Sequence, residues 1–366
     1  MIDGILLIIL VFRKRKILGN VEYRKFRNNR KRMVKPMNEQ LKKALRDILL
    51  DRYGIDIDRA KCYFSTQNYA FIFPGEPFMI RVSATPKKTR SEILSELMWL
   101  DDLKQFKQTV CEPNVSLKGN LLEEFEIEGK TYRASMFRTA RGVIKETTDI
   151  TPMFFICCGD LLGAIHHVST DEREKGFKFM RGTKADDFSS MKERVAGKIP
   201  ADILVRINKI EARVAALPQS IGRYGLCHGD FHMNNFFVEE NNIWVFDFDG
   251  CAYAHYLYDI ASLIQACFLR GYGAGRDLRE VMENDILRYF KIGYTLNMEC
   301  DEHFWDDLEL FMMYRTALTY MALCEIDKVG VLEDTQKIKQ FFAYLVSQDD
   351  VMDAMTTAMK NMGAMT

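Results

Sequence analysis

The stretch from Tyr224 to Gly250, YGLCHGDFHMNNFFVEENNIWVFDFDG, constrains this chain more than any other part of it. It predicts a β-hairpin, with apolar strands at residues 236–238 and 243–246 around a polar turn. Acidic, amide and histidine side chains precede the first strand, and Asp247 and Asp249 follow the second. Because a hairpin brings its two ends together, these groups are expected to lie side by side.

The grouped polar residues suit phosphoryl transfer. Asp230 and Asn235 repeat the H-x-D-x-x-x-x-N spacing of the kinase catalytic loop, and Asp247 stands where kinases place the metal-binding Asp of D-F-G. The reaction requires a divalent cation to neutralise nucleotide phosphates and a group to orient the attacking hydroxyl. Mg²⁺ takes hard oxygen ligands. The third residue is here Asp249 rather than Gly, and Asn234 is a rival to Asn235, although the five-residue spacing favours Asn235.

The motifs HGDFHMNN and VFDFDG together resemble those of the aminoglycoside phosphotransferase and choline kinase-like family. These are small-molecule kinases with a protein-kinase-like fold. In this family the loop has the approximate pattern HGDxHxxN, and the strand that leads to the metal site is an apolar run ending in IDF or IDFD. The resemblance implies that Asp230 is the catalytic carboxylate and that Asn235 and Asp247 hold the metal. It leaves Asp249 to reach a second metal or the substrate.

Other residues of the C-terminal half are assigned mainly structural roles. His228 is expected to brace the loop by hydrogen bonding, and His232 is left with either a structural or a catalytic role. By resemblance to family patterns, His166 in LLGAIHHVS is structural and Asp259 in LYDIASL braces the catalytic loop. The highly charged residues 170–200 are predicted to form loop and short helices that suit a substrate-binding insertion.

The N-terminal half carries the pattern of a sheet that covers nucleotide phosphates. Residues 61–73 are predicted to form two strands around a loop from Ser65 to Asn68, and residues 78–82 a third strand that contains Arg81. The loop lacks glycine, and the resemblance makes Ser65 and Asn68 cofactor-binding residues. Arg81 takes the place of the usual lysine, and its planar fork can grip phosphate oxygens. The alternative is a solvent-facing arginine on an edge strand.

Glu96 is the expected ion-pair partner of Arg81. It lies on a helix predicted over residues 88–106, in ELMWLDDL, which resembles the family pattern E-x-x-x-L-x-x-L. Glu92, one turn earlier, is the rival, and either carboxylate could be a solvated helix charge. The choice between them stays open.

The composition is typical of a soluble enzyme of the cytoplasm. Hydrophobic residues make up 48% and charged residues 28% of 366, enough chain for two lobes with cores. A net charge of zero gives no sign of nucleic-acid binding. Nine cysteines without a CxxC pair or zinc-ligand spacing are the usage of a reducing compartment.

Residues 1–36 differ from the rest in charge. They carry eleven basic and two acidic residues, a net charge of +9, so the remainder carries −9. The apolar run 5–12 is too short to span a bilayer, and positive charge follows it, unlike in a secretory signal. One interpretation is a basic membrane-surface anchor, and membrane contact is expected only under it. The favoured one is that translation begins at Met37, where MNEQLKKAL starts a helix.

The expected fold is α+β, a bilobal protein-kinase-like fold. An antiparallel-sheet N-lobe spans residues 37–137, a mainly helical C-lobe spans 138–346, and 347–366 form a frayed helix or tail. The expected function is ATP- and Mg²⁺-dependent transfer of the γ-phosphoryl group to a hydroxyl of an aminoglycoside, amino alcohol, sugar or amino acid. The alternatives are a protein Ser/Thr kinase of the same fold and a non-catalytic nucleotide-binding scaffold, which only the missing glycines and Arg81 support.

Overall fold

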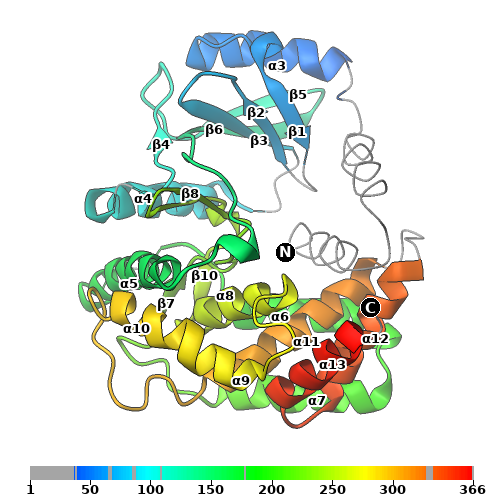
Figure 1. Ribbon diagram of the computed structural model, residues 1–366. Coiled ribbons are helices and arrows are strands. Elements are labelled where there is room, and N and C mark those ends of the chain that lie inside the picture. Colours follow the sequence, from blue (N-terminus) through cyan, green and yellow to red (C-terminus); the bar gives the residue numbers. More distant parts are fainter. Residues whose placement is uncertain are drawn as a thin grey trace. The chain divides into compact units, whose positions relative to one another are not determined.

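The computed structural model describes residues 37, 39–64, 68–84, 88–107, 109–176, 179–326 and 333–364. The described chain divides into two compact units. The N-terminal unit holds the residues up to Arg141 together with Trp244–Phe246, and the C-terminal unit holds Gly142–Ile243 and the residues from Asp247 on. The predicted α+β class, with a sheet-containing N-terminal part and a helical C-terminal part, is confirmed (Figure 1). The predicted extension over residues 1–36 lies outside the described residues.

The N-terminal unit is built on one antiparallel sheet. Its strand order follows β1 (Lys61–Phe64), β2 (Asn68–Ile72), β3 (Phe78–Ala84), β6 (Lys130–Arg138) and β4 (Pro113–Asn114), and β5 (Glu123–Ile127) also pairs with β6. The three strands expected before residue 84 are present. In β3, Arg81 pairs across to Ala70 of β2 and Ser135 of β6, so it lies on an interior strand and not on an edge.

Two helices accompany this sheet. Helix α3 (Glu39–Tyr53) buries Leu45 and Leu49 in one core with the sheet residues Phe71, Ile80 and Val82. Helix α4 (Arg90–Phe106) begins with a capping box, in which the side chains of Thr89 and Glu92 each accept a hydrogen bond from the other residue's backbone N–H group.

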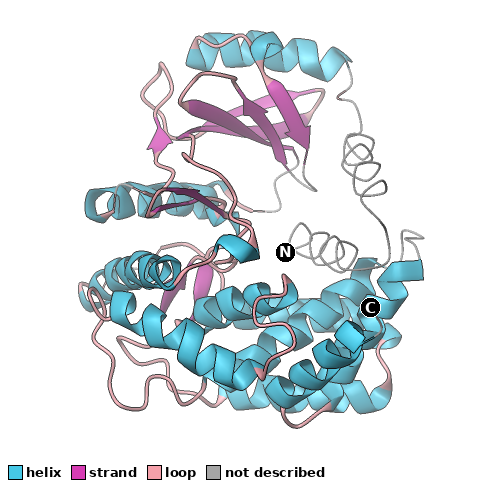
Figure 2. Ribbon diagram, viewed as in Figure 1, coloured by secondary structure: helices cyan, strands magenta, loops and turns pink. Residues whose placement is uncertain are grey.

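The C-terminal unit is mainly helical, as Figure 2 shows. Its longer helices are α5 (Pro152–Glu174), α6 (Lys184–Val195), α7 (Ala201–Ala215), α8 (Leu257–Leu269), α11 (Leu308–Ile326), α12 (Glu333–Ser347) and α13 (Val351–Ala364). Between α8 and α11 the chain forms α9 (Leu278–Glu280), a π-helical segment η5 (Val281–Leu287) and α10 (Arg288–Tyr294).

Glycines let α5 and α10 approach closely. A Cβ atom at Gly159 would lie 2.1 Å from the carbonyl oxygen of Phe290, and one at Gly293 would lie 1.9 Å from that of Ile156. Of the described helices, α5 alone is long and apolar enough to cross a membrane, and 67% of its apolar window is buried inside the protein. Burial of this extent is that of a core helix.

Two segments differ from the sequence expectations. Residues 184–195, expected within loop and short helices, form the full helix α6 with its own capping box at Thr183 and Asp186. Residues 351–364, expected as a frayed helix or tail, form α13, whose Met352 and Met355 are fully buried. Packing against α9 and α12 supplies the apolar environment that orders this Met-rich helix.

Two small antiparallel sheets position the polar stretch of the C-terminal unit. Strands β8 (Phe236–Glu239) and β9 (Asn242–Val245) form the predicted hairpin, and Glu240 in its turn has a left-handed φ of 55°. Strands β7 (Tyr224–Cys227) and β10 (Ala252–His255) pair from Cys227↔Ala252 to Tyr224↔His255. The residues that follow β7 therefore lie beside those that precede β10.

Candidate active site

The loop after β7 is locked against the segment before β10. Gly229 has a left-handed φ of 81°, and a Cβ atom there would lie 2.2 Å from the carbonyl oxygen of Gly250. Only glycine allows this approach, which explains the Gly of the HGD motif. In the segment before β10, Gly250 lies against Asp230, because a Cβ atom added at Gly250 would be 3.8 Å from the Asp230 Cβ atom. The two motifs that the sequence singled out are thus brought together.

Asp259, at the start of α8, braces the loop after β7 by hydrogen bonding. Its carboxylate accepts hydrogen bonds from the backbone N–H groups of His228 at 2.7 Å and Gly229 at 2.8 Å. The Nε2 atom of His166 lies 3.5 Å from the same carboxylate. Burial works to raise the pKa of Asp259, but the hydrogen bond and charge of His166 outweigh it, so the pKa lies below its ordinary value. The predicted bracing role of Asp259 agrees with these contacts.

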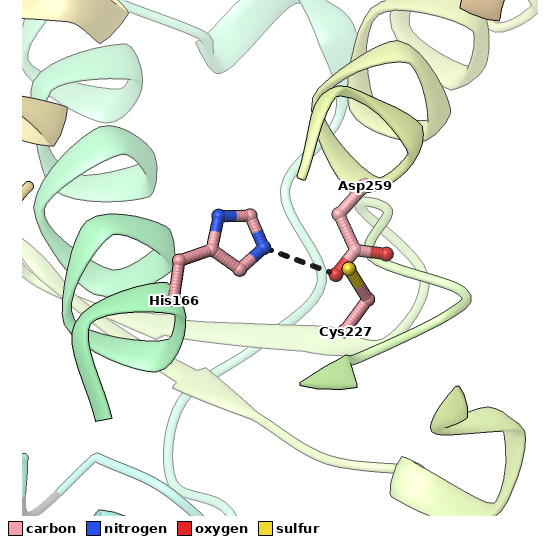
Figure 3. A group of neighbouring side chains, drawn as sticks. All are labelled: His166, Cys227 and Asp259. Carbon is pink, nitrogen blue, oxygen red and sulfur yellow. Dashed lines mark ion pairs between the residues drawn. The ribbon is translucent and has the colours of Figure 1, made fainter. Parts of the chain in front are cut away.

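Figure 3 shows that His166, Cys227 and Asp259 form a buried cluster with the ligand types of a metal site. Its chemistry does not fit one. Burial raises the pKa of the Cys227 thiol well above its ordinary value. The Nδ1 atom of His166 is engaged by the Tyr294 hydroxyl at 2.8 Å, and both Asp259 oxygens already accept backbone hydrogen bonds. The cluster is a structural brace.

Asp230 lies in a cationic environment. The Nε2 atom of His232 is 3.3 Å from one of its carboxylate oxygens, and the Nη2 atom of Arg315 is 3.6 Å from the other. The pKa of Asp230 lies well below its ordinary value: burial works to raise it, whereas the charge and hydrogen bond of His232 and the charge of Arg315 are among the causes that lower it. Asp230 keeps 17% of its side chain exposed, which leaves it ionised and reachable.

Asn235 is tied to Asp230. Its Nδ2 atom donates a hydrogen bond to the Asp230 carbonyl oxygen at 2.9 Å, which orients its amide oxygen away from that contact. Asn234, the rival residue, accepts a hydrogen bond from Arg270 at 3.2 Å instead. Asp247 ends the hairpin with a left-handed backbone (φ 67°), an uncommon conformation for a non-glycine residue.

The donor set of this loop fits a hard divalent cation. Asp247 and Asp249 supply carboxylate oxygens, and Asn235 supplies an amide oxygen. Arg181 fixes the backbone around them by donating to the carbonyl oxygens of Cys251 at 2.8 Å and Asp249 at 2.7 Å.

In the N-terminal unit, the expected pair of Arg81 and Glu96 is present. The Nη1 atom of Arg81 donates to Glu96 at 2.8 Å, and the guanidinium lies 4.8 Å from the centre of the Phe137 ring. The rival Glu92 is committed to the capping box of Thr89. Asn68 accepts a hydrogen bond from the Ser83 hydroxyl at 2.7 Å. Ser65 lies outside the described residues.

Sequence reasoning missed three cationic residues of the C-terminal unit. Arg181 and Lys184 fall in the charged segment that identified no ligand, and both are buried. Arg315 lies on α11, far along the chain from the loop that it contacts. A signal for it was available, since Arg315 is the one basic residue of LELFMMYRTALTYMALCEI, whose other charged residues, Glu309 and Glu325, lie near the two ends. A charge among apolar residues in the middle of a helix is uncommon unless it is paired.

Comparison with known proteins gives consistent matches. Residues 63–284 match a family described as the phosphotransferase enzyme family. The amicoumacin kinase of Bacillus subtilis (strain 168) is 22% identical over 292 residues, which cover 78% of this chain and 86% of that protein.

Solved structures resemble the whole fold. An amicoumacin kinase, hAmiN, in complex with AMP-PNP, Ca²⁺ and Ami superposes with a TM-score of 0.74 at 20% identity, covering 89% of this chain and 97% of the other. A microcompartment-associated aminopropanol kinase gives a TM-score of 0.65 at 18% identity, covering 87% of this chain and 98% of the other. At these identities the structural likeness establishes a kinase-like fold.

Proposed function

Because this chain belongs to the phosphotransferase enzyme family, it is an ATP-dependent enzyme that phosphorylates a hydroxyl group of a small molecule, and we propose here which residues perform the reaction. The observation that carries the proposal is the pair of Asp230 and Asn235. They are joined by a hydrogen bond within one loop, and Asp259 braces that loop through two backbone amides.

Asp230 accepts or orients the proton of the acceptor hydroxyl. Its carboxylate is ionised, since the nearby His232 and Arg315 hold its pKa well below the ordinary value despite burial. A carboxylate of low pKa is a weak base, so its main contribution is to orient the hydroxyl for attack. In a loose transition state, positioning and charge neutralisation supply most of the acceleration.

We assign Asn235, Asp247 and Asp249 to a magnesium site. Mg²⁺ bound there would neutralise charge on the nucleotide phosphates. The oxygen-only donor set supports this cation, and a relative was solved with Ca²⁺, which also takes oxygen ligands. Asp247 is proposed as the main ligand, with Asp249 reaching a second cation or the substrate.

In the N-terminal unit, we assign phosphate contacts to Arg81, with Glu96 fixing its guanidinium. Arginine presents a planar fork that binds two phosphate oxygens at once. The loop from Ser65 to Asn68 is proposed to close over the nucleotide, as the family resemblance implies. The partner hydrogen bond from Ser83 gives Asn68 a defined side-chain orientation for that role.

The acceptor is a small molecule with a hydroxyl group. Relatives are described as kinases of amicoumacin and aminopropanol, which supports an acceptor that carries an amine beside its hydroxyl. A magnesium-dependent ATP turnover screen tests this, with amino alcohols, aminoglycosides, sugars, amino acids and a generic protein substrate as acceptors. Turnover with the protein substrate alone would favour the protein kinase alternative, and none with any acceptor would favour a scaffold.

The metal assignment has its own test. Asp247→Ala is expected to abolish metal-supported ATP binding while leaving the fold intact, because the carboxylate at this strand end supplies the cation with its strongest ligand. Calorimetric titration with MgATP measures the affinity, and circular dichroism checks the fold. Unchanged affinity in the variant would remove Asp247 from the metal site.

We infer a cytoplasmic location from the cysteines. None of the nine cysteines forms a disulfide bond, and five of the described ones on separate elements are fully buried, namely Cys158, Cys227, Cys251, Cys267 and Cys324. Buried thiols that behave as small apolar residues are typical of a reducing compartment. Nonreducing electrophoresis of protein taken from cells would reveal disulfides if the location were oxidising.

A further inference from the structure

Arg315 is a buried cation whose surroundings are unusual for an apolar helix. Only 10% of its side chain is exposed. Its Nη1 atom donates to the Tyr258 hydroxyl at 2.7 Å, and its Nη2 atom lies 3.6 Å from Asp230. Its Nε atom is buried and has no hydrogen-bond partner among the described residues. A charge held in this way must be compensated, and Asp230 is the carboxylate closest to it.

We propose that Arg315 is a positioning residue for phosphoryl transfer, which fixes the Asp230 carboxylate and stabilises its negative charge. The proposal rests on the assignment of Asp230 as the catalytic carboxylate. Arg315 has its Nη1 atom engaged by the Tyr258 hydroxyl and its Nε atom buried, and it presents its Nη2 atom to Asp230. It acts through Asp230.

Tyr258 explains why the arginine points at the loop. The Arg315 guanidinium lies 5.0 Å from the centre of the Tyr258 ring, in addition to its hydrogen bond to the hydroxyl. A ring contact and a directional hydrogen bond together restrict the planar group to one orientation. Tyr258 precedes Asp259 in α8, so one helical turn carries both the clamp for Arg315 and the brace for the loop.

Other charged groups face Asp230 from each neighbouring element. His232 lies on the same loop at 3.3 Å, and Asp249 lies next to the Gly250 backbone that contacts Asp230. Lys184, from α6, lies 5.7 Å from the centre of the Tyr258 ring and pairs with Asp187 at 3.3 Å. The like charge of Asp249 works to raise the pKa of a neighbouring carboxyl, whereas nearby cations lower it. Arg315 and Lys184 keep their charge throughout the working range of an enzyme, and Arg315 lies 3.6 Å from the Asp230 carboxylate.

An uncompensated carboxylate would be expensive to bury. Removing one member of a buried ion pair leaves the other charged and unpaired, whereas replacing both by apolar groups is often neutral. The structure keeps the pair, and it keeps it beside the proposed catalytic carboxylate. A helix that only had to fill the core would do better with an apolar residue at position 315.

The test compares Arg315→Met, which removes the charge but keeps a long side chain, with Arg315→Lys, which keeps a charge. Arg315→Met is expected to lower kcat about tenfold with little change in KM for ATP. Arg315→Lys should restore most of the lost kcat, because it keeps a cation at this position.

Two controls separate positioning from general damage. Arg194→Met removes an arginine that is half exposed and pairs with Glu325 at the surface, so its kcat and KM should match those of the wild type. Tyr258→Phe removes the hydroxyl that orients Arg315 but leaves both charges, so it should lower kcat less than Arg315→Met does.

A stability measurement tests the contact without activity. Arg315→Met should lower Tm by about 4 °C in the wild-type background and by less than half of that in the D230N background, where no carboxylate is left unpaired. Equal losses of Tm in both backgrounds, or an unchanged kcat in Arg315→Met, would overturn the proposal. If the wild type phosphorylates no acceptor, the assignment of Asp230 fails. Unequal Tm losses in the two backgrounds would then show that Arg315 and Asp230 form a purely structural pair, and the positioning role would be overturned as well.

Discussion

Among the described residues, each unit holds a buried arginine–carboxylate pair beside an aromatic ring, and the pairs Arg81–Glu96 and Arg315–Asp230 are built differently. In the N-terminal unit, Arg81 donates to Glu96 at 2.8 Å, and the Glu96 side chain is only 1% exposed. In the C-terminal unit, Arg315 stands 3.6 Å from Asp230, which keeps 17% of its side chain exposed. Both arginines also lie over an aromatic ring, Phe137 in one case and Tyr258 in the other.

The difference assigns opposite members of the two pairs to chemistry. The Glu96 carboxylate is buried and hydrogen-bonded to Arg81, so we infer that the arginine is the member of this pair that meets a ligand. The Asp230 carboxylate is farther from its arginine and partly exposed, so we infer that it is the member that accepts a proton or a hydrogen bond from a substrate. Removing a member of each pair should therefore affect different kinetic constants.

The largest expected effect comes from Asp230→Asn. The substitution keeps size and most hydrogen bonding but removes the negative charge and the proton-accepting capacity. Turnover should fall by roughly 10²-fold or more, the scale of a lost general base or orienting carboxylate. MgATP affinity should change little, because the proposed role faces the acceptor.

Measuring affinity and phosphoryl transfer on the same two preparations decides the matter. A scaffold would bind ATP in both forms and transfer phosphate in neither. Equal turnover in wild type and variant would remove Asp230 from the chemistry, and with it the alignment from which the metal ligands were assigned.

The units also differ in how they should respond to acid, because all six histidines lie between residues 166 and 303, in the C-terminal unit. Burial, reinforced by the charge of Arg223, lowers the pKa of His255 to about 4. Between the ordinary value of about 6.5 and 4, the unfolded chain binds a proton at this position and the folded protein does not, so stability falls as pH falls. From pH 7 to pH 5 this amounts to about 2 kcal/mol.

His255→Phe should reduce the loss of stability on acidification by that amount, measured as the free energy of unfolding in denaturant at the two pH values. The ring contacts of His255 with Tyr224 and Phe311 make phenylalanine a suitable replacement. His303→Phe is the matched control for the loss of a histidine at an exposed position, and the change of slope in His255→Phe is expected to exceed the change in this control. An unchanged slope in His255→Phe would show that this histidine is protonated in the folded protein.

The parts of the site that were predictable from sequence are those carried by local spacing. Asp230 and Asn235 belong to one short loop, and the hairpin that follows returns the chain to Asp247 through turn and strand signals that a sequence displays directly. The fold class followed in the same way from strand patterns early in the chain and helical patterns later.

The parts that were not predictable depend on packing between distant segments. Arg315 and Lys184 reach the loop only because α11 and α6 pack together in the C-terminal unit, and no local pattern records that contact. The Met-rich residues 347–366 were expected to form a frayed helix or tail, whereas contacts of α13 with α9 and α12 bury residues such as Met352 and Met355. The choice between Glu92 and Glu96 needed the side-chain geometry of α4.

A smaller effect is expected from weakening the Arg81–Glu96 pair. Glu96→Gln should raise KM for ATP about tenfold and leave kcat nearly unchanged, because the charge-assisted hydrogen bond that fixes Arg81 becomes a neutral one. Steady-state kinetics with varied MgATP at saturating acceptor measure the two constants separately. A loss confined to kcat would contradict the assignment of Arg81 to nucleotide binding.

The smallest effect is expected one helical turn away, at Glu92. This carboxylate accepts hydrogen bonds from the backbone N–H group of Thr89 at 2.7 Å and from its hydroxyl at 2.8 Å, so it serves the start of α4 and not Arg81. Glu92→Ala should reduce the free energy of unfolding by about 0.5–1 kcal/mol, the scale of a lost cap, and leave KM for ATP unchanged. Glu92→Gln should restore the lost stability, because glutamine fills the same position of a capping box. A rise in KM for either Glu92 variant comparable to that of Glu96→Gln would mean that both carboxylates hold Arg81. The contrast between the Arg81–Glu96 pair and the Arg315–Asp230 pair would then no longer stand.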